Sequence, residues 1–251
     1  MTTLSGHTAI VTGGGTGIGR ATVLALSREG ARVWAVARDQ PRLEKVREEA
    51  AKGSVEARAF DATDGAAIKR LIDEAEPDIV VLSAGVRPRT ATIEEQTWES
   101  FSEAWNTDLK IAFDAGQAAL RRPLRSGSVV VVVSSGAGLG GSPISGGYAG
   151  AKRMQMFLAG YLQGASDARK LGIRFVALVP KQLIAGTQIA SKAARGYAER
   201  AGISEEKYME RFGAPLTADD VAKTILDIVR GEVGAGSTVL GLSSKNGVEA
   251  L

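Results

Sequence analysis

Short runs of β-branched and other apolar residues recur along the chain, and segments with helical spacing separate them. The apolar runs cover residues 7–12, 32–37, 55–60, 78–82, 128–134, 173–179 and 237–240. Strands that alternate with helices of ten or more residues indicate βαβ units, which build a parallel sheet covered on both faces. Near-continuous apolar runs agree with this, because a strand buried on both sides need not alternate with polar residues.

Local signals place three of the helices between these runs. The first is expected to begin near Gly17 and to end at Gly30. Asp39 is suited to the N-cap of the second helix, and Thr217 begins a capping-box variant before the last one. No repeat or linker interrupts the pattern. We therefore expect one α/β domain over residues 1–251, a doubly wound parallel sheet of about seven strands with helices on both faces.

Residues 187–212 differ from the alternating pattern. This segment is long, moderately polar and prone to form helix, and it lies between the sixth predicted strand and the last predicted helix. Long insertions in compact α/β domains often cover an active site. Our hypothesis is that residues 187–212 form a mobile substrate lid.

Composition excludes several classes of protein. The chain has 31 Lys and Arg against 28 Asp and Glu, which gives a net charge of +3, and 44% of its residues are hydrophobic. Such a chain can form a core, and its scattered basic residues and few aromatic residues argue against a nucleic-acid partner. Without cysteine it has no disulfide, thiolate nucleophile or Cys-ligated metal, and we expect no metal site. The absence of a signal peptide and of a long apolar run predicts a cytoplasmic protein without a membrane partner.

A glycine-rich loop follows the first predicted strand. Residues 12–19 read Thr-Gly-Gly-Gly-Thr-Gly-Ile-Gly and lead directly into the first helix. Strand, glycine turn and helix N-terminus together form the arrangement that cradles a pyrophosphate. The alternative is a tight turn without a ligand. The residues expected at the cofactor are Gly13, Gly15, Thr16, Gly17 and Ile18.

The end of the second predicted strand indicates which dinucleotide binds. An acidic residue there would bind the ribose 2′-OH of NAD, but this chain has Ala37 followed by Arg38. The guanidinium of Arg38 is suited to a 2′-phosphate, so we predict NADP(H). In the alternative interpretation Arg38 is only solvated and Asp39 takes the acidic role, although Asp39 is better explained as a helix cap.

Four residues carry the candidate chemistry. Tyr148 and Lys152 are four positions apart, so they lie on one face of a helix, where the ammonium can lower the pKa of the phenol and make it a usable general acid. Ser135 comes at the end of the fifth predicted strand, where open α/β sheets bind their ligands. Asn106 adds an amide that could hold a water chain to Lys152.

Taken together, these ordered motifs resemble the classical short-chain dehydrogenase/reductase family from about Leu4 to Ile228. The glycine signature matches residues 12–19, the aspartate on the adenine side matches Asp61 next to Ala62, the fourth-strand motif matches Ser83, Ala84 and Gly85, and the catalytic tetrad matches Asn106, Ser135, Tyr148 and Lys152. The resemblance implies a Rossmann fold, hydride transfer between nicotinamide and a carbonyl carbon, and a homotetramer or homodimer. In this family Lys152 would also bind the nicotinamide ribose.

Some positions depart from the family pattern. Ser83 stands where the family has asparagine, and Lys181 follows Pro180 where the family has glycine. Pro180 is still expected at the cofactor; Lys181 could attract an anionic substrate group, or it could simply point to solvent. Thr187 is the candidate for the family's threonine that binds the carboxamide. Gly146 and Gly147 suggest a roomy approach to the neighbouring tyrosine.

The sequence thus predicts an NADP(H)-dependent carbonyl reductase or alcohol dehydrogenase acting on a small to medium, partly apolar ketone or secondary alcohol. One alternative keeps the fold and the cofactor but makes the enzyme an epimerase or cyclase in a biosynthetic pathway. The other is a regulator that senses NADP(H) without turnover, against which the intact tetrad argues.

Overall fold

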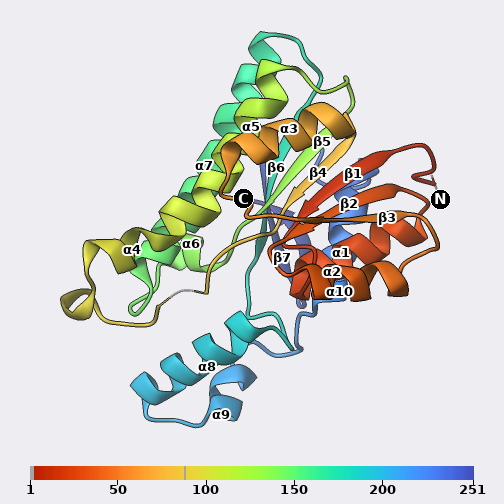
Figure 1. Cartoon of the computed structure of the whole chain (residues 1–251). Coiled ribbons are helices and arrows are strands. Elements are labelled where there is room, and N and C mark those ends of the chain that lie inside the picture. The colour runs from red at the N-terminus through yellow and green to blue at the C-terminus, as the bar shows by residue number, and fades with distance from the viewer. Residues whose placement is uncertain (1–2, 88) are drawn as a thin grey trace.

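The computed structural model describes residues 3–87 and 89–251 and contains an eight-stranded sheet (Figure 1). The strands lie in the order β3-β2-β1-β4-β5-β6-β7-β8, and all neighbours are parallel except β7 and β8. Their bounds are β1 Thr8–Thr12, β2 Arg32–Ala37, β3 Val55–Ala59, β4 Ile79–Leu82, β5 Val129–Val133, β6 Arg174–Pro180, β7 Val239–Ser243 and β8 Gly247–Ala250.

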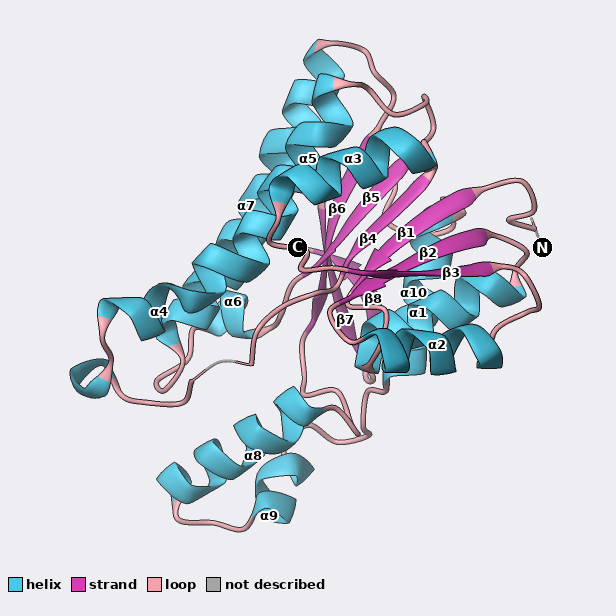
Figure 2. Ribbon diagram, in the orientation of Figure 1, coloured by secondary structure: helices cyan, strands magenta, loops and turns pink. Residues whose placement is uncertain are grey.

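Helices cover both faces of this sheet (Figure 2). One face carries α1 (Gly17–Arg28), α2 (Gln40–Glu49) and α10 (Ala218–Val229); the other carries α3 (Gly65–Ala75), α5 (Lys110–Arg121) and α7 (Gly146–Ala168). In β1, Ala9 and Val11 pack into the first core while Ile10 packs into the second. Alternate side chains of a strand point to opposite faces, so each strand contributes to both cores.

The remaining helices lie at the carboxyl end of the sheet. The short helix η1 (Ile93–Glu95) precedes α4 (Trp98–Ala104), which continues through a π-helical segment, η2 (Trp105–Leu109), into α5. The short α6 (Ala137–Gly140) precedes α7, while α8 (Gln188–Ala201) and α9 (Glu205–Glu210) stand apart from the sheet in Figure 1. A β-bridge between Ile184 and Leu216 joins the two chain segments that lead to and from α8 and α9.

The predicted α/β fold is confirmed, with one strand more than expected. The first helix begins at Gly17, Asp39 caps α2 by accepting a hydrogen bond from the Arg42 N–H, and Thr217 caps α10. The additional strand is β8, which pairs with β7 after a turn over residues 244–246 and begins at Gly247, with φ +66°. Glycine adopts this left-handed conformation without the steric cost that a Cβ would bring. Among the described residues, no helix is long and apolar enough to cross a membrane.

The strand order changes direction next to the glycine loop. From β1 the chain passes through β2 and β3 on one side, and it returns to β4 on the other side of β1. The connections therefore diverge between the carboxyl ends of β1 and β4. In open α/β sheets, ligands bind at such a switch point.

Candidate active site

The glycine loop keeps its backbone close to the rest of the sheet. Gly13 has φ +72°, and a Cβ there would lie 2.9 Å from the backbone nitrogen of Ala84. A Cβ at Gly19 would lie 2.2 Å from the Gly13 carbonyl oxygen. Gly17 is exposed at the start of α1, and the atom nearest to a Cβ built there is Thr187 Cγ2, at 3.6 Å. The loop thus leaves the N-terminus of α1 open, which suits a diphosphate.

The ends of β1 and β4 are tied together beside this loop. The Thr12 hydroxyl oxygen accepts hydrogen bonds from the backbone N–H groups of Ser83 and Ala84, each at 3.1 Å. This tie uses backbone donors of the fourth-strand motif, so it does not depend on which side chain occupies position 83.

The end of β2 presents an exposed cation. The Arg38 side chain is 78% exposed, and its nearest carboxylate oxygen, on Asp61, is 3.9 Å away. Hydrogen bonds from Thr63 hold the pKa of Asp61 below its usual value, and the charge of Arg38 adds to this effect. Asp39 is already engaged, because it caps α2 and pairs with Arg42 at 3.0 Å.

Tyr148 and Lys152 lie together on α7 beneath a large cavity. The Lys152 Nζ atom is 5.5 Å from the centroid of the Tyr148 ring. Ser135, just after β5, and Tyr148 both line the same cavity, which has a volume of about 580 Å³. Since Lys152 is one helical turn below the phenol, its charge acts on the ring from the protein side while the cavity side stays open.

A buried carboxylate holds Lys152 in place. Lys152 Nζ lies 3.0 Å from Asp108 Oδ2 and donates a hydrogen bond to the Val133 carbonyl at 3.1 Å. The side chains of Lys152 and Asp108 are only 8% and 1% exposed. Burial on its own disfavours the ammonium, but the charge of Asp108, its hydrogen bond and Tyr148 outweigh this and raise the pKa of Lys152.

Asp108 is itself fixed by several contacts. Its Oδ1 atom accepts a hydrogen bond from the Val86 N–H at 2.8 Å and another from the Thr107 hydroxyl at 3.1 Å. Buried Gln155 on α7 donates to the Asp108 carbonyl at 2.9 Å. These bonds join η2, α7 and the segment after β4. We call Ser135, Tyr148, Lys152 and Asp108 the floor of the cavity, or the floor.

Asn106 lies in the same π-helical segment as Asp108 but points elsewhere. Its side-chain nitrogen donates to the Ser102 hydroxyl at 3.2 Å. The structure therefore places Tyr148 beside Lys152 and Ser135 at the same cavity as Tyr148, and it directs the Asn106 amide toward α4. A water chain from Asn106 to Lys152 stays a prediction. Single π-helical turns are rare in proteins, and those that occur are often found at functional sites.

The structure agrees with neither interpretation of Lys181, as an anchor for an anionic substrate group or as a side chain that points to solvent. It lines the cavity together with Pro180, but its ammonium is engaged in an ion pair with Glu249 of β8. It is therefore neither a free substrate anchor nor a simply solvated side chain. Thr187 caps α8, since its hydroxyl accepts from the Ala190 N–H at 3.2 Å, and its methyl group faces Gly17 of the glycine loop.

The interpretation of Gly147 as a source of space is wrong. A Cβ at Gly147 would lie 1.9 Å from the Phe101 carbonyl oxygen, because the backbone of α4 passes directly against α7. The Trp105 indole N–H also donates to the Gly147 carbonyl at 2.9 Å. The missing side chain thus lets two helices approach each other, which positions the turn that carries Tyr148.

Sequence reasoning missed Asp108 altogether. The only signal was a carboxylate two positions after Asn106 in a segment that continues into an apolar helix face. Aspartate is almost never fully buried without a partner, so the sequence could predict a buried Asp108 only if its partner were already known. The partner, Lys152, comes from a distant helix.

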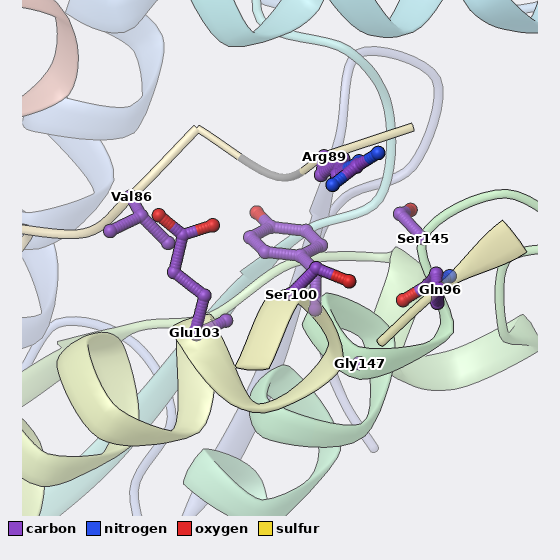
Figure 3. A pocket seen from close by; sticks show the side chains of 9 residues that line it. Val86, Arg89, Gln96, Ser100, Glu103, Ser145 and Gly147 are labelled. Atoms are coloured by element: carbon purple, nitrogen blue, oxygen red, sulfur yellow. The ribbon is translucent and has the colours of Figure 1, made fainter. Parts of the chain in front are cut away.

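A second, smaller recess lies on the other side of Tyr148. It has a volume of about 10 Å³, and its other lining residues include Glu103 and Arg89, which Figure 3 shows on opposite sides. A space of this size holds about one water molecule.

Comparisons with known proteins agree with this architecture. A family model described as short chain dehydrogenase matches residues 7–197. The chain is 36% identical over 132 residues to L-xylulose reductase of Mesocricetus auratus, with 52% of this chain and 53% of the relative covered. It is 32% identical over 203 residues to an uncharacterized NAD-dependent oxidoreductase of Mycobacterium tuberculosis, with 70% and 71% covered. The alignment thus spans only about half the length of the first relative.

A solved structure has the same fold. The crystal structure of levodione reductase superimposes with a TM-score of 0.81 at 23% sequence identity, and the match covers 95% of this chain and 96% of that one. The family model covers about three quarters of the chain, and a relative of more than 30% identity aligns over two thirds of its own length. The chain therefore belongs to the short-chain dehydrogenase family of oxidoreductases, whose members bind a nicotinamide cofactor.

Proposed function

We propose that this protein is an NADP(H)-dependent reductase that interconverts a ketone and a secondary alcohol. The observation that carries the proposal is the buried ammonium of Lys152 beneath the Tyr148 ring, with the phenol at the base of a cavity that Ser135 also lines. A carbonyl group at this point can accept a proton from the phenol and a hydrogen bond from the serine. A sensor without turnover has no need for this pair.

The residues of the floor have separate tasks in this proposal. The nicotinamide, when bound, supplies the hydride that reduces the carbonyl carbon. Tyr148 donates the proton that converts the oxygen to a hydroxyl, and Ser135 hydrogen-bonds the same oxygen as negative charge develops on it. Lys152 stabilises the phenolate left behind, and Asp108 acts through Lys152 as a positioning residue. Asn106 would connect the site to solvent.

The cofactor preference rests on Arg38. It is exposed at the end of β2, and the neighbouring Asp39 is engaged as a helix cap rather than free for a ribose hydroxyl. A guanidinium forms charge-assisted hydrogen bonds with phosphate that are stronger than neutral ones. We therefore propose NADP(H), bound along residues 13–18, Asp61, Ala62, residues 83–85, Tyr148, Lys152, Pro180 and Thr187.

Arg38→Ala tests the cofactor assignment. Loss of a hydrogen-bonded ionic contact corresponds to about 1.5–3 kcal/mol, so the Kd for NADPH should rise about 10-fold to 100-fold while that for NADH stays nearly unchanged. Fluorescence titration of both dinucleotides measures the two constants. Arg47→Ala is the control, since Arg47 lies on α2 and pairs with Glu44. Equal weakening of NADH and NADPH would refute the assignment.

Tyr148→Phe tests the reaction. Positioned proton donors contribute about 10²-fold to 10⁴-fold, so NADPH oxidation with ketones should fall by about that factor while NADPH binding persists. The matched control is Tyr161→Phe on the same helix, where the side chain is exposed. Undiminished turnover would remove Tyr148 as the acid.

Three further statements stay proposals. Helices α8 and α9 line the cavity over the floor, which supports residues 187–212 as a substrate lid on a single domain. A homotetramer or homodimer rests on the family resemblance. Cytoplasmic location rests on the sequence argument alone.

A further inference from the structure

The wall of the large cavity is basic. Among the described residues its lining includes five cationic side chains and no Asp or Glu, although the chain as a whole has 31 basic and 28 acidic residues. The five are Arg87, Lys181, Lys192, Arg200 and Arg211. A cavity lined by one sign of charge raises the local concentration of ligands of the opposite sign.

Four of these five cations have no ion-pair partner. Lys181 is paired with Glu249, but within residues 3–87 and 89–251 no carboxylate lies within 4 Å of the other four. We call Arg87, Lys192, Arg200 and Arg211 the mouth cations. Elsewhere, about half of the chain's basic residues form such pairs.

The contrast holds within a single helix. On α8, Lys192 and Arg200 face the cavity two turns apart, on the same side as Tyr197. Arg195 of the same helix does not line the cavity and pairs with Glu205 at 3.0 Å. Glu94, outside the cavity, is near enough to Arg200 to interact with it, but the two do not form an ion pair. On α8, the cation outside the cavity is therefore ion-paired, and the two cations that line the cavity are available to a ligand.

Aromatic rings stand beside these cations. Tyr197 and Tyr208 stack with ring centroids 5.5 Å apart, and Phe212 packs against Tyr208 edge to face. The guanidinium of Arg211 lies over the Tyr208 ring at 5.2 Å. All four residues line the cavity. This part of the cavity lining therefore combines apolar ring faces with positively charged side chains.

We propose that the substrate of the reductase is a carbonyl compound or alcohol with an apolar or aromatic body and an anionic group, carboxylate or phosphate. The apolar body packs against the aromatic rings of α8 and α9, the mouth cations bind the anion, and the carbonyl lies at Tyr148 and Ser135. This inference rests on the proposed function and narrows it to a substrate class. It assigns recognition of the substrate's charge to the mouth cations rather than to Lys181.

The test compares matched substrates that differ in charge. We would measure NADPH oxidation with 4-acetylbenzoate, its neutral methyl ester and 4-acetylphenyl phosphate at low and high ionic strength. Charge-assisted contacts predict a kcat/KM at least about tenfold higher for one of the anions than for the ester, and this preference should shrink as salt screens the charges. Preference for the carboxylate or for the phosphate identifies the anion.

Variants of the mouth cations locate the effect. The double variant Lys192→Gln, Arg200→Gln should lose most of the preference for the anion, because its kcat/KM should fall much more for the anion than for the ester. Arg195→Gln, on the same helix, is the control. Calorimetric titration of 4-acetylbenzoate and its ester into protein loaded with NADP⁺ reads the same difference without turnover. If no ketone is reduced, the proposed function fails, and these titrations alone decide the inference. Equal affinity for acid and ester, or equal loss in the control, would overturn it.

Discussion

Charged side chains are arranged in opposite ways in the floor of the cavity and in the proposed lid, residues 187–212. In the floor, Lys152 and Asp108 are almost fully buried and bound to each other and to backbone groups. In the lid, Lys192 and Arg200 are exposed to the cavity without a carboxylate partner among the described residues. An unpaired charge costs much free energy when it is buried, whereas an exposed charge stays hydrated at little cost and is available to a ligand.

Under the proposed function, this difference assigns the chemistry to the floor and the choice of substrate to the lid. A proton donor must be held in one position, and the floor achieves this with a network in which each charged group has partners from different elements. The lid is attached to the domain at its base, where Ile184 pairs with Leu216 and Gln182 donates to the Ala214 carbonyl at 2.8 Å. Changes in the floor should therefore cost stability and rate together, and changes in the lid should alter substrate preference.

Asp108→Asn is expected to have the largest effect on the floor. Breaking one side of a buried ion pair costs about 3–5 kcal/mol, so the free energy of unfolding should fall by about that amount. In the native protein the raised pKa of Lys152 contributes stability at neutral pH, and this contribution is lost only as the pH rises through that pKa. Without Asp108, burial dominates and lowers the pKa of Lys152. The alkaline limb of kcat/KM should then move to lower pH.

A surface pair provides the control for this variant. Asp114→Asn removes the partner of Lys110 on α5, where both side chains are more accessible, and should cost no more than about 1 kcal/mol. Denaturant unfolding gives the stabilities, and the pH profile separates a positioning role from a structural one. An unchanged alkaline limb in folded Asp108→Asn would show that Asp108 does not act through Lys152.

Gly147→Ala is expected to have the next largest effect. A Cβ at Gly147 would lie 1.9 Å from the Phe101 carbonyl oxygen, so α4 and α7 must separate, at a cost of about 1–3 kcal/mol. At Gly146 the nearest atom to a Cβ would be a Phe101 ring carbon at 3.6 Å, so Gly146→Ala should be nearly neutral. Thermal unfolding of the two variants measures the difference. If both behave alike, the close approach of the two helices does not position the floor.

Much of the fold could be predicted from sequence because its signals are local. Strands buried on both faces are continuous apolar runs, and the caps at Asp39 and Thr217 follow from side chains that bond to nearby backbone. The strand β8 was missed although Asn246-Gly247 is a typical hairpin signal.

The parts of the site that escaped prediction depend on contacts between distant segments. Tyr148 and Lys152 are one helical turn apart, so their proximity follows from spacing alone. The pairing of Asp108 with Lys152 and the contact of Gly147 with Phe101 join different elements, and no periodicity in one segment reveals its partner in another. The bond of Asn106 to Ser102 depends in the same way on the backbone of the π-helical segment.

Tyr197→Phe should have the smallest effect, and it tests the lid directly. The Tyr197 hydroxyl bonds to Ser142 and lies 3.5 Å from the Ser145 hydroxyl, which connects α8 to the loop after α6. Phenylalanine keeps the stacking on Tyr208 but removes this bond, so we expect a loss of about 0.5–1.5 kcal/mol in the lid contact, seen as faster amide exchange in residues 187–212. Tyr208→Phe is the control, since among the described residues its hydroxyl has no hydrogen-bond partner. Because the floor is held by separate contacts, the exchange of η2 should stay unchanged. Faster exchange in η2 as well would mean that lid and floor are coupled rather than independent.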